Sequence, residues 1–274
     1  MFKPLLILLL AISINDSVLA ATKTYSRFLI STVNPCTYCS NHIACRSTWR
    51  FSEQCLPNVE FVEMTPELRN YLLDLHNERR NIIAGGMEKG FDPAVRMATM
   101  SWNYEFEYLS KLNLLQCVTK HDKCRRTPDY PYVGQNLASV RWTNYNFTLD
   151  YVLEMLVDYW YRENQYITKY DVKYMKKRTD LPHKIGHFTL MAQERANEVG
   201  CAISRQSTAN VSEVFLACDY SFTSFYNVSV YREGSPASQC QSGQNPKYPN
   251  LCSVQEVYNI KDIEYENNLF NFIF

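Results

Sequence analysis

The chain has 274 residues, of which 46% are hydrophobic and 20% charged, and its Lys and Arg balance its Asp and Glu at 28 each. A chain of this length can bury a sizeable core. Its zero net charge provides no field that would steer nucleic acid or an acidic membrane surface towards it, so we expect no nucleic-acid partner.

Residues 1–20 have the layout of a secretory signal peptide. Lys3 precedes an apolar run of signal length, and Val18-Leu19-Ala20 supplies the cleavage positions. The segment is too short and wrongly flanked for a membrane span, although a retained anchor is the alternative reading. We expect an exported, secreted chain that begins near Ala21 and has no membrane span.

Ten cysteines in an exported chain predict disulfides, because the secretory pathway is oxidising. They are Cys36, Cys39, Cys45, Cys55, Cys117, Cys124, Cys201, Cys218, Cys240 and Cys252. Cys36 and Cys39 form a C-x-x-C motif, but no second such motif or suitably spaced His follows to complete a zinc ribbon. Spacing alone leaves the pairing open, since eight cysteines already permit about 105 connectivities.

Three N-x-S/T sequons predict a glycoprotein that carries its glycans on surface loops. Their acceptor residues are Asn146, Asn210 and Asn227.

Residues 21–60 lack sustained periodicity, so we expect an irregular arm held by its four cysteines. A helix should begin at Thr65-Pro66-Glu67. Thr is a good N-cap, Pro is tolerated in the first turn, and Glu favours the positive helix end. Gly85-Gly86 should end this helix.

Apolar spacing predicts a second helix from Trp102 towards Cys117 and a third from Leu149 to Trp160. Glu163 continues the apolar stripe of the third helix. Because unpaired burial of a carboxylate is costly, Glu163 either reaches solvent at a frayed helix end or faces a cleft with a partner.

Two apolar runs, residues 187–191 and 214–218, are interpreted as strands. Cys201 and Cys218 lie where neighbouring strands could be stapled. Helices followed by strands predict an α+β domain.

Six motifs, taken together and in this order, resemble the CAP superfamily (cysteine-rich secretory proteins, antigen 5 and pathogenesis-related 1). Within it the chain is most similar to the insect antigen-5 or venom-allergen-like group. The motifs are HNERR at 76–80, WN at 102–103, HDKC with YVGQNLA within 121–138, YWYRE at 159–163, GHFTLMAQERANEVGCA at 186–202 and FLACDYS at 215–221. The resemblance covers about residues 36–256.

This resemblance implies an α-β-α sandwich, in which a small antiparallel sheet lies between helical layers beside an open cleft. Together with the signal peptide at 1–20 and the cysteine-rich arm at 21–60, it predicts a CAP domain at 61–232 and a short C-terminal extension at 233–274 with one disulfide. It also implies the disulfides Cys36–Cys45, Cys39–Cys124, Cys55–Cys117 and Cys201–Cys218, which leaves Cys240–Cys252.

The family's cleft carries two histidines and two acidic residues, and the motifs place them at His121, Gln135, Glu163 and His187. Gln135 departs from the Glu of many relatives, which removes one negative charge and one potential general base. His121, Glu163 and His187 remain as a set for weakly bound zinc or another divalent cation. His76, beside apolar helix positions, is expected to be structural.

No catalytic residue is predicted, because the sequence has no G-x-S-x-G, no H-E-x-x-H and no expected free cysteine. The leading hypothesis is a secreted, non-enzymatic protein that binds a protein partner or a small lipophilic ligand, with a seminal-fluid role in male reproduction. A metal-dependent hydrolase using His121, Glu163 and His187 and a lipid or sterol carrier are the alternatives. The aromatic tail beyond Cys252 should pack on the domain or contact a partner.

Overall fold

The computed structural model describes residues 34–45, 47–177 and 185–261. The predicted signal peptide and the last residues of the tail, 262–274, lie outside this part. Within it, no helix is long and apolar enough to cross a membrane.

The centre of the fold is a five-stranded sheet with the order β1-β4-β5-β3, in which β2 pairs with β4 off this path. Its neighbours along that order are antiparallel, whereas β2 runs parallel to β4. The strands are β1 (Glu60–Phe61), β2 (Ser101–Trp102), β3 (Gly134–Thr143), β4 (Glu198–Ser207) and β5 (Val211–Tyr220). Cys201 and Cys218 lie directly opposite each other on β4 and β5 and are disulfide-bonded.

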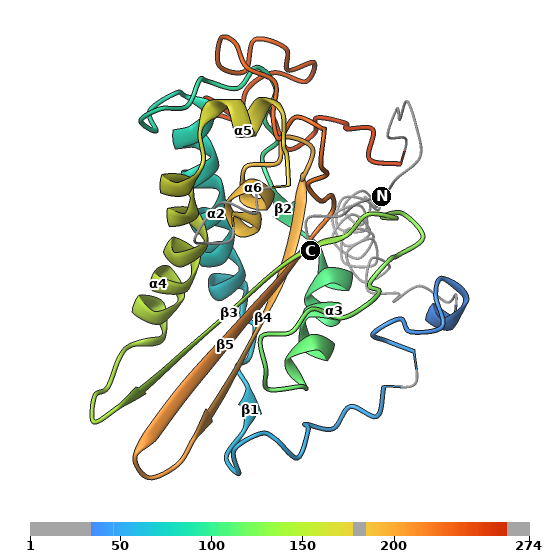
Figure 1. The fold of residues 1–274 in the computed structure, drawn as a ribbon, viewed down its shortest axis with the longest axis vertical. Coiled ribbons are helices and arrows are strands. Elements are labelled where there is room, and N and C mark those ends of the chain that lie inside the picture. The colour runs from blue at the N-terminus through green and yellow to red at the C-terminus, as the bar shows by residue number, and fades with distance from the viewer. Residues whose placement is uncertain (1–33, 46, 178–184, 262–274) are drawn as a thin grey trace, which may run out of the picture. The chain divides into compact units, whose positions relative to one another are not determined.

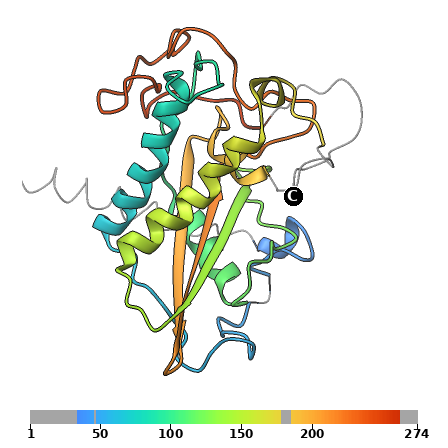
Figure 2. The ribbon, with the colours of Figure 1, turned by 60° about the vertical axis from the view of Figure 1, so that its left-hand side comes forward.

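Helices cover both faces of the sheet, so the predicted α-β-α sandwich is confirmed (Figure 1). The helices α2 (Pro66–Ala84), α4 (Leu149–Tyr161) and α6 (Gly186–Met191) lie on one face, and α3 (Tyr104–Leu114) lies on the other. Figure 2 shows α2 and α4 together in front of the strands. The short elements are η1 (Pro35–Thr37), η2 (Arg162–Tyr166) and α5 (Lys169–Lys173).

The first predicted helix is confirmed, because α2 begins at the expected cap. The Thr65 side chain accepts a hydrogen bond from the Leu68 amide, Pro66 occupies the first turn, and the helix ends before Gly85. The third predicted helix is α4, and its apolar stripe is buried from Val152 to Trp160.

Two sequence predictions about elements were wrong. Residues 187–191 form α6 rather than a strand. A short apolar run that is buried from several sides has no periodicity that separates a strand from a helix. Trp102 belongs to β2, and the second helix begins only at Tyr104, because the Asn103 side chain caps it by accepting from the Phe106 amide.

Five disulfides connect the described cysteines in the pairs that the resemblance implies. Two of them tie the arm to the domain: Cys39 pairs with Cys124, and Cys55 pairs with Cys117. The described part of the arm is irregular apart from η1 and β1.

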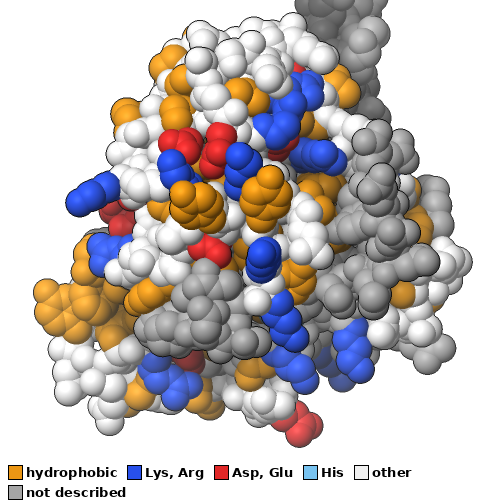
Figure 3. Space-filling model, turned by 45° about the horizontal axis from the view of Figure 1, so that its top comes forward, with side chains coloured by type: hydrophobic (Ala, Val, Ile, Leu, Met, Phe, Trp, Pro, Cys, Tyr) orange, Lys and Arg blue, Asp and Glu red, His pale blue; other side chains and the backbone are white. Residues whose placement is uncertain are grey.

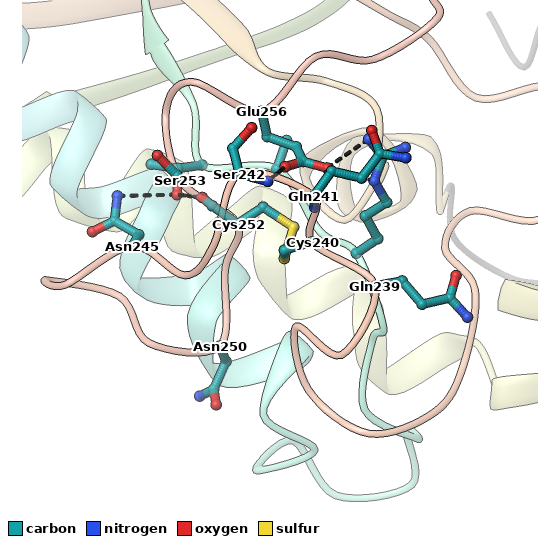
Figure 4. Close-up of a disulfide and its surroundings, with 12 residues drawn as sticks. Gln239, Cys240, Gln241, Ser242, Asn245, Asn250, Cys252, Ser253 and Glu256 are labelled. Atoms are coloured by element: carbon teal, nitrogen blue, oxygen red, sulfur yellow. Dashed lines mark hydrogen bonds and ion pairs between the residues drawn. A yellow bond between two sulfur atoms is a disulfide. The ribbon is translucent and has the colours of Figure 1, made fainter.

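The segment after the domain packs back onto it through polar contacts (Figure 4). Cys240 and Cys252 form a disulfide, and the buried Glu256 carboxylate accepts from the Gln241 and Ser242 amides and from Arg96. Tyr258 is buried and donates to the Arg96 carbonyl. The tail therefore packs on the domain as far as this residue.

Candidate functional site

The loop before β3 places His121 against Gln135, the second residue of that strand. His121 Nδ1 lies 2.9 Å from Gln135 Oε1. The amide orientation is fixed, because Gln135 Nε2 donates to two carboxyl groups, Asp122 Oδ2 at 2.8 Å and Asp219 Oδ1 at 2.9 Å. An amide oxygen only accepts, so His121 Nδ1 carries the proton of the neutral ring.

The second histidine, His187, is held by Glu163, which lies on η2 directly after α4. Glu163 Oε1 lies 2.6 Å from His187 Nδ1, and Glu163 Oε2 accepts from the Phe188 amide at 3.0 Å. Trp160 stacks against the His187 ring, with centroids 6.2 Å apart. Glu163 is thus a buried, partnered carboxylate, and the alternative of an exposed, frayed helix end was wrong.

The pKa of His121 is lowered to about 4, mainly by burial and then by the nearby Arg125 and His187, which outweigh the hydrogen bond to Gln135 and the charge of Asp122. The ring is therefore neutral at physiological pH. His121 also lines a pocket of about 290 Å³ with Arg125 and Tyr132.

We call His121, Gln135, Glu163 and His187 the two-histidine site. Among the residues that the structure describes, no three His, Cys, Asp or Glu side chains are grouped so that they could hold a metal ion. The three-residue set expected from the sequence is not assembled, because both Glu163 oxygens accept hydrogen bonds from the segment that carries His187.

A divalent cation bound here would have the two imidazoles as its protein ligands. Each Nδ1 is paired with a side-chain oxygen, which leaves Nε2 as the nitrogen with the lone pair in the neutral ring. Metal-binding histidines usually have their other ring nitrogen oriented in this way. The remaining ligands would come from water or from a partner.

The family model of the cysteine-rich secretory protein family, CAP, matches residues 73–220, which is more than half of the chain. The chain belongs to this family. The matched range lies inside the segment 61–232 that the sequence motifs predict as the CAP domain, whose limits remain a proposal.

Insect allergens are among the relatives of this CAP chain. It is 36% identical to Venom allergen-1 of Aedes aegypti over 220 residues, which cover 78% of this chain and 84% of that relative. It is also 37% identical to the Antigen 5 like allergen Cul n 1 of Culicoides nubeculosus. The match extends over 168 residues, which cover 61% of this chain and 74% of that relative.

Solved structures match the CAP chain at lower identity. Na-ASP-1 has a TM-score of 0.58 and 25% identity, covering 74% of this chain and 50% of that one. The structure of NaASP2 with Zn²⁺ has a TM-score of 0.55 and 24% identity, and the match covers 73% of this chain and 100% of that one. The latter likeness shows the fold alone.

Three side chains that complete the site in this CAP chain were not predicted. Asp122 and Asp219 accept from Gln135, and Arg125 donates to Gln135 Oε1 at 3.2 Å and pairs with Asp122. Asp122 and Arg125 flank Cys124 in the predicted loop. Asp219 is found only through the strand register, which places it opposite Gln135 on β5.

His76 does not belong to the two-histidine site. Its ring is fully buried, with Nδ1 donating to the Leu72 carbonyl at 2.7 Å and Nε2 lying 2.9 Å from the Tyr220 hydroxyl. Burial lowers its pKa to about 4. These contacts support the structural role that its helix position predicts.

The sequon residues Asn146, Asn210 and Asn227 are exposed, as glycan attachment requires, and glycosylation stays a prediction. Basic and acidic side chains lie next to each other on the face shown in Figure 3, in keeping with the balanced charge of the chain.

Proposed function

We propose that this CAP chain is a secreted, extracellular binding protein whose two-histidine site holds a divalent cation weakly, and that it is not an enzyme. The observation that carries the proposal is the fixed Nδ1 hydrogen bond on each imidazole. Zn²⁺ suits such a site because it binds imidazole nitrogen well. Zn²⁺ is also the ion named with the NaASP2 structure, whose likeness to this chain shows the fold alone.

The same contacts argue against a hydrolase. Gln135 cannot act as a base, and both oxygens of Glu163 already accept hydrogen bonds from the segment that carries His187. All described cysteines are in disulfides, so none of them can serve as a nucleophile. A relative named Venom allergen-1 and the five disulfides support release into an extracellular fluid, for which seminal fluid remains our tissue hypothesis.

Calorimetric titration with Zn²⁺ at pH 7 tests the cation site. His187→Ala should weaken binding by at least roughly tenfold, and His121→Ala/His187→Ala should abolish it, because each removes an oriented nitrogen ligand. The control is His42→Gln. His42 lies outside the two-histidine site, and its Nε2 hydrogen-bonds the Arg126 carbonyl. If the double variant bound Zn²⁺ as tightly as the unmodified protein, the two-histidine site would not be the cation site.

A small lipophilic ligand is the second candidate, favoured by a pocket of about 540 Å³ where β3, β4 and β5 meet the start of α4. This volume lies within the usual range for ligand sites. Polar and apolar side chains both line it, and the ion pair between Arg205 and Glu60 is part of its polar lining. The apolar lining consists of Val59, Trp142, Phe147, Leu149, Val152 and Val214.

Displacement of a fluorescent fatty acid tests this pocket. Leu149→Glu should abolish binding, because it introduces a carboxylate into the apolar lining. The matched control is Tyr159→Glu, which adds the same charge to an exposed position of α4 that does not line the pocket. Equal retention of the fatty acid by both variants would contradict a lipophilic ligand in this pocket.

A further inference from the structure

Asp219 is a fully buried carboxyl group beneath the two-histidine site. It lies on β5 directly opposite Gln135 of β3, and its Oδ1 accepts from Gln135 Nε2 at 2.9 Å. Its other oxygen, Oδ2, has no hydrogen-bond partner within the described part of the chain. A buried carboxylate normally collects several donors, so one with a single short hydrogen bond is unusual.

The charged neighbours do not supply what an ionised Asp219 would need. Arg125 Nε is 3.9 Å from Asp219 Oδ1 but 3.0 Å from Asp122 Oδ1, so its guanidinium is committed to Asp122. Asp122 itself is a second negative group beside Asp219. From α3, Ser110 contacts the carboxyl and by itself lowers the pKa of Asp219, but less than burial raises it, and the Ser110 hydroxyl also donates to the Gly200 carbonyl at 3.0 Å.

Because the Ser110 hydroxyl donates to the Gly200 carbonyl, its oxygen is left to accept from a protonated Asp219. A carboxylic acid suits these neighbours better than a carboxylate: its carbonyl oxygen accepts from Gln135, and its hydroxyl has Ser110 Oγ as the nearby acceptor. Burial agrees with this arrangement, since it raises the pKa of Asp219 to about 8.

We propose that Asp219 is a positioning residue that works as a neutral carboxylic acid, holding the Gln135 amide in the orientation that presents its oxygen to His121. The inference goes beyond the proposed function, because it holds whether or not the site binds a cation.

Amide replacement distinguishes the neutral acid from a carboxylate, because Asn has the shape and hydrogen-bonding pattern of a protonated Asp. Asp219→Asn should be at least as stable as the unmodified protein at pH 7. The matched control is Glu256→Gln, a second buried carboxyl, which accepts from Arg96 and two backbone amides. Those contacts lower the pKa of Glu256 despite its burial, so Glu256→Gln should unfold more readily.

The pH profile provides the readout that a merely structural role would not change. The pKa of Asp219 is higher in the folded state than in the unfolded state. Its protonated carboxyl therefore contributes fully to folding stability below about pH 4, and this contribution is lost as the pH rises towards 8. The unfolding constant of the unmodified protein should therefore rise relative to that of Asp219→Asn by about tenfold per pH unit between about pH 5 and 7, and level off above pH 8.

Asp219→Leu tests the positioning itself, since Leu keeps the bulk but offers Gln135 no acceptor. NMR signals of the His121 ring should be unchanged in Asp219→Asn and shifted in Asp219→Leu. The proposal is overturned if Asp219→Asn loses as much stability as Glu256→Gln with no dependence on pH. It is also overturned if the His121 signals respond identically to Asn and Leu.

Discussion

Arg80→Ala should destabilise the protein by about 4 kcal/mol, because Arg80 is a fully buried guanidinium that bonds three carbonyl groups. Its Nε and Nη2 donate to Ala98, and its Nη1 donates to Met191 and Gln193. Alanine would leave these acceptors unpaired and open a cavity beside α2. Denaturant unfolding with the disulfides intact measures the loss.

The control for Arg80 is Arg205→Ala. Arg205 is exposed and pairs with Glu60 at 2.7 Å on the surface, where such pairs contribute at most about 1 kcal/mol. Arg80→Lys should fall between the two, because an ammonium cannot reproduce the planar fork of donors. Similar losses in Arg80→Ala and Arg205→Ala would show that the buried contacts contribute little.

Gly200→Ala is expected to cost about 3 kcal/mol or more and to reduce the yield of folded protein. A Cβ at this position of β4 would lie 2.2 Å from the Asn103 carbonyl oxygen and 2.4 Å from the Glu107 amide nitrogen. Both are backbone atoms at the start of α3, so the helix would have to move away from the sheet. Thermal unfolding and secreted yield provide the measurement.

Gly243→Ala is the control for Gly200→Ala, because at this position an added Cβ strains the backbone conformation without contacting other atoms. Nothing lies within 4 Å of a Cβ there, but its φ of +79° disfavours an L side chain by about 1–2 kcal/mol. If Gly200→Ala cost no more than Gly243→Ala, the close approach of β4 and α3 would not limit the fold.

The long helices could be predicted from sequence because the residues that begin, end and bury each of them lie within the helix or next to it. A Thr cap, a proline in the first turn and a terminal glycine pair define α2, and an apolar stripe defines α4. The six residues of α6 carry no such signal, since their burial comes from neighbouring segments.

The candidate site divides in the same way. Motif resemblance found His121, Gln135, Glu163 and His187, and the structure adds that Glu163 orients His187. The contact between Gln135 and Asp219 spans 84 residues of sequence and depends on the register of β3 and β5. No periodicity within one segment reports a register between two.

The bridge Cys55–Cys117 is nested inside the bridge Cys39–Cys124, because residues 55 and 117 both lie inside the segment that Cys39–Cys124 closes. A protease that cuts the chain anywhere between residues 56 and 116 would leave two fragments joined at two covalent points. The fragments could not diffuse apart, and the loop that carries His121 would stay attached to both. In a fluid rich in proteases, such a molecule can survive a broken backbone for as long as its disulfides remain oxidised.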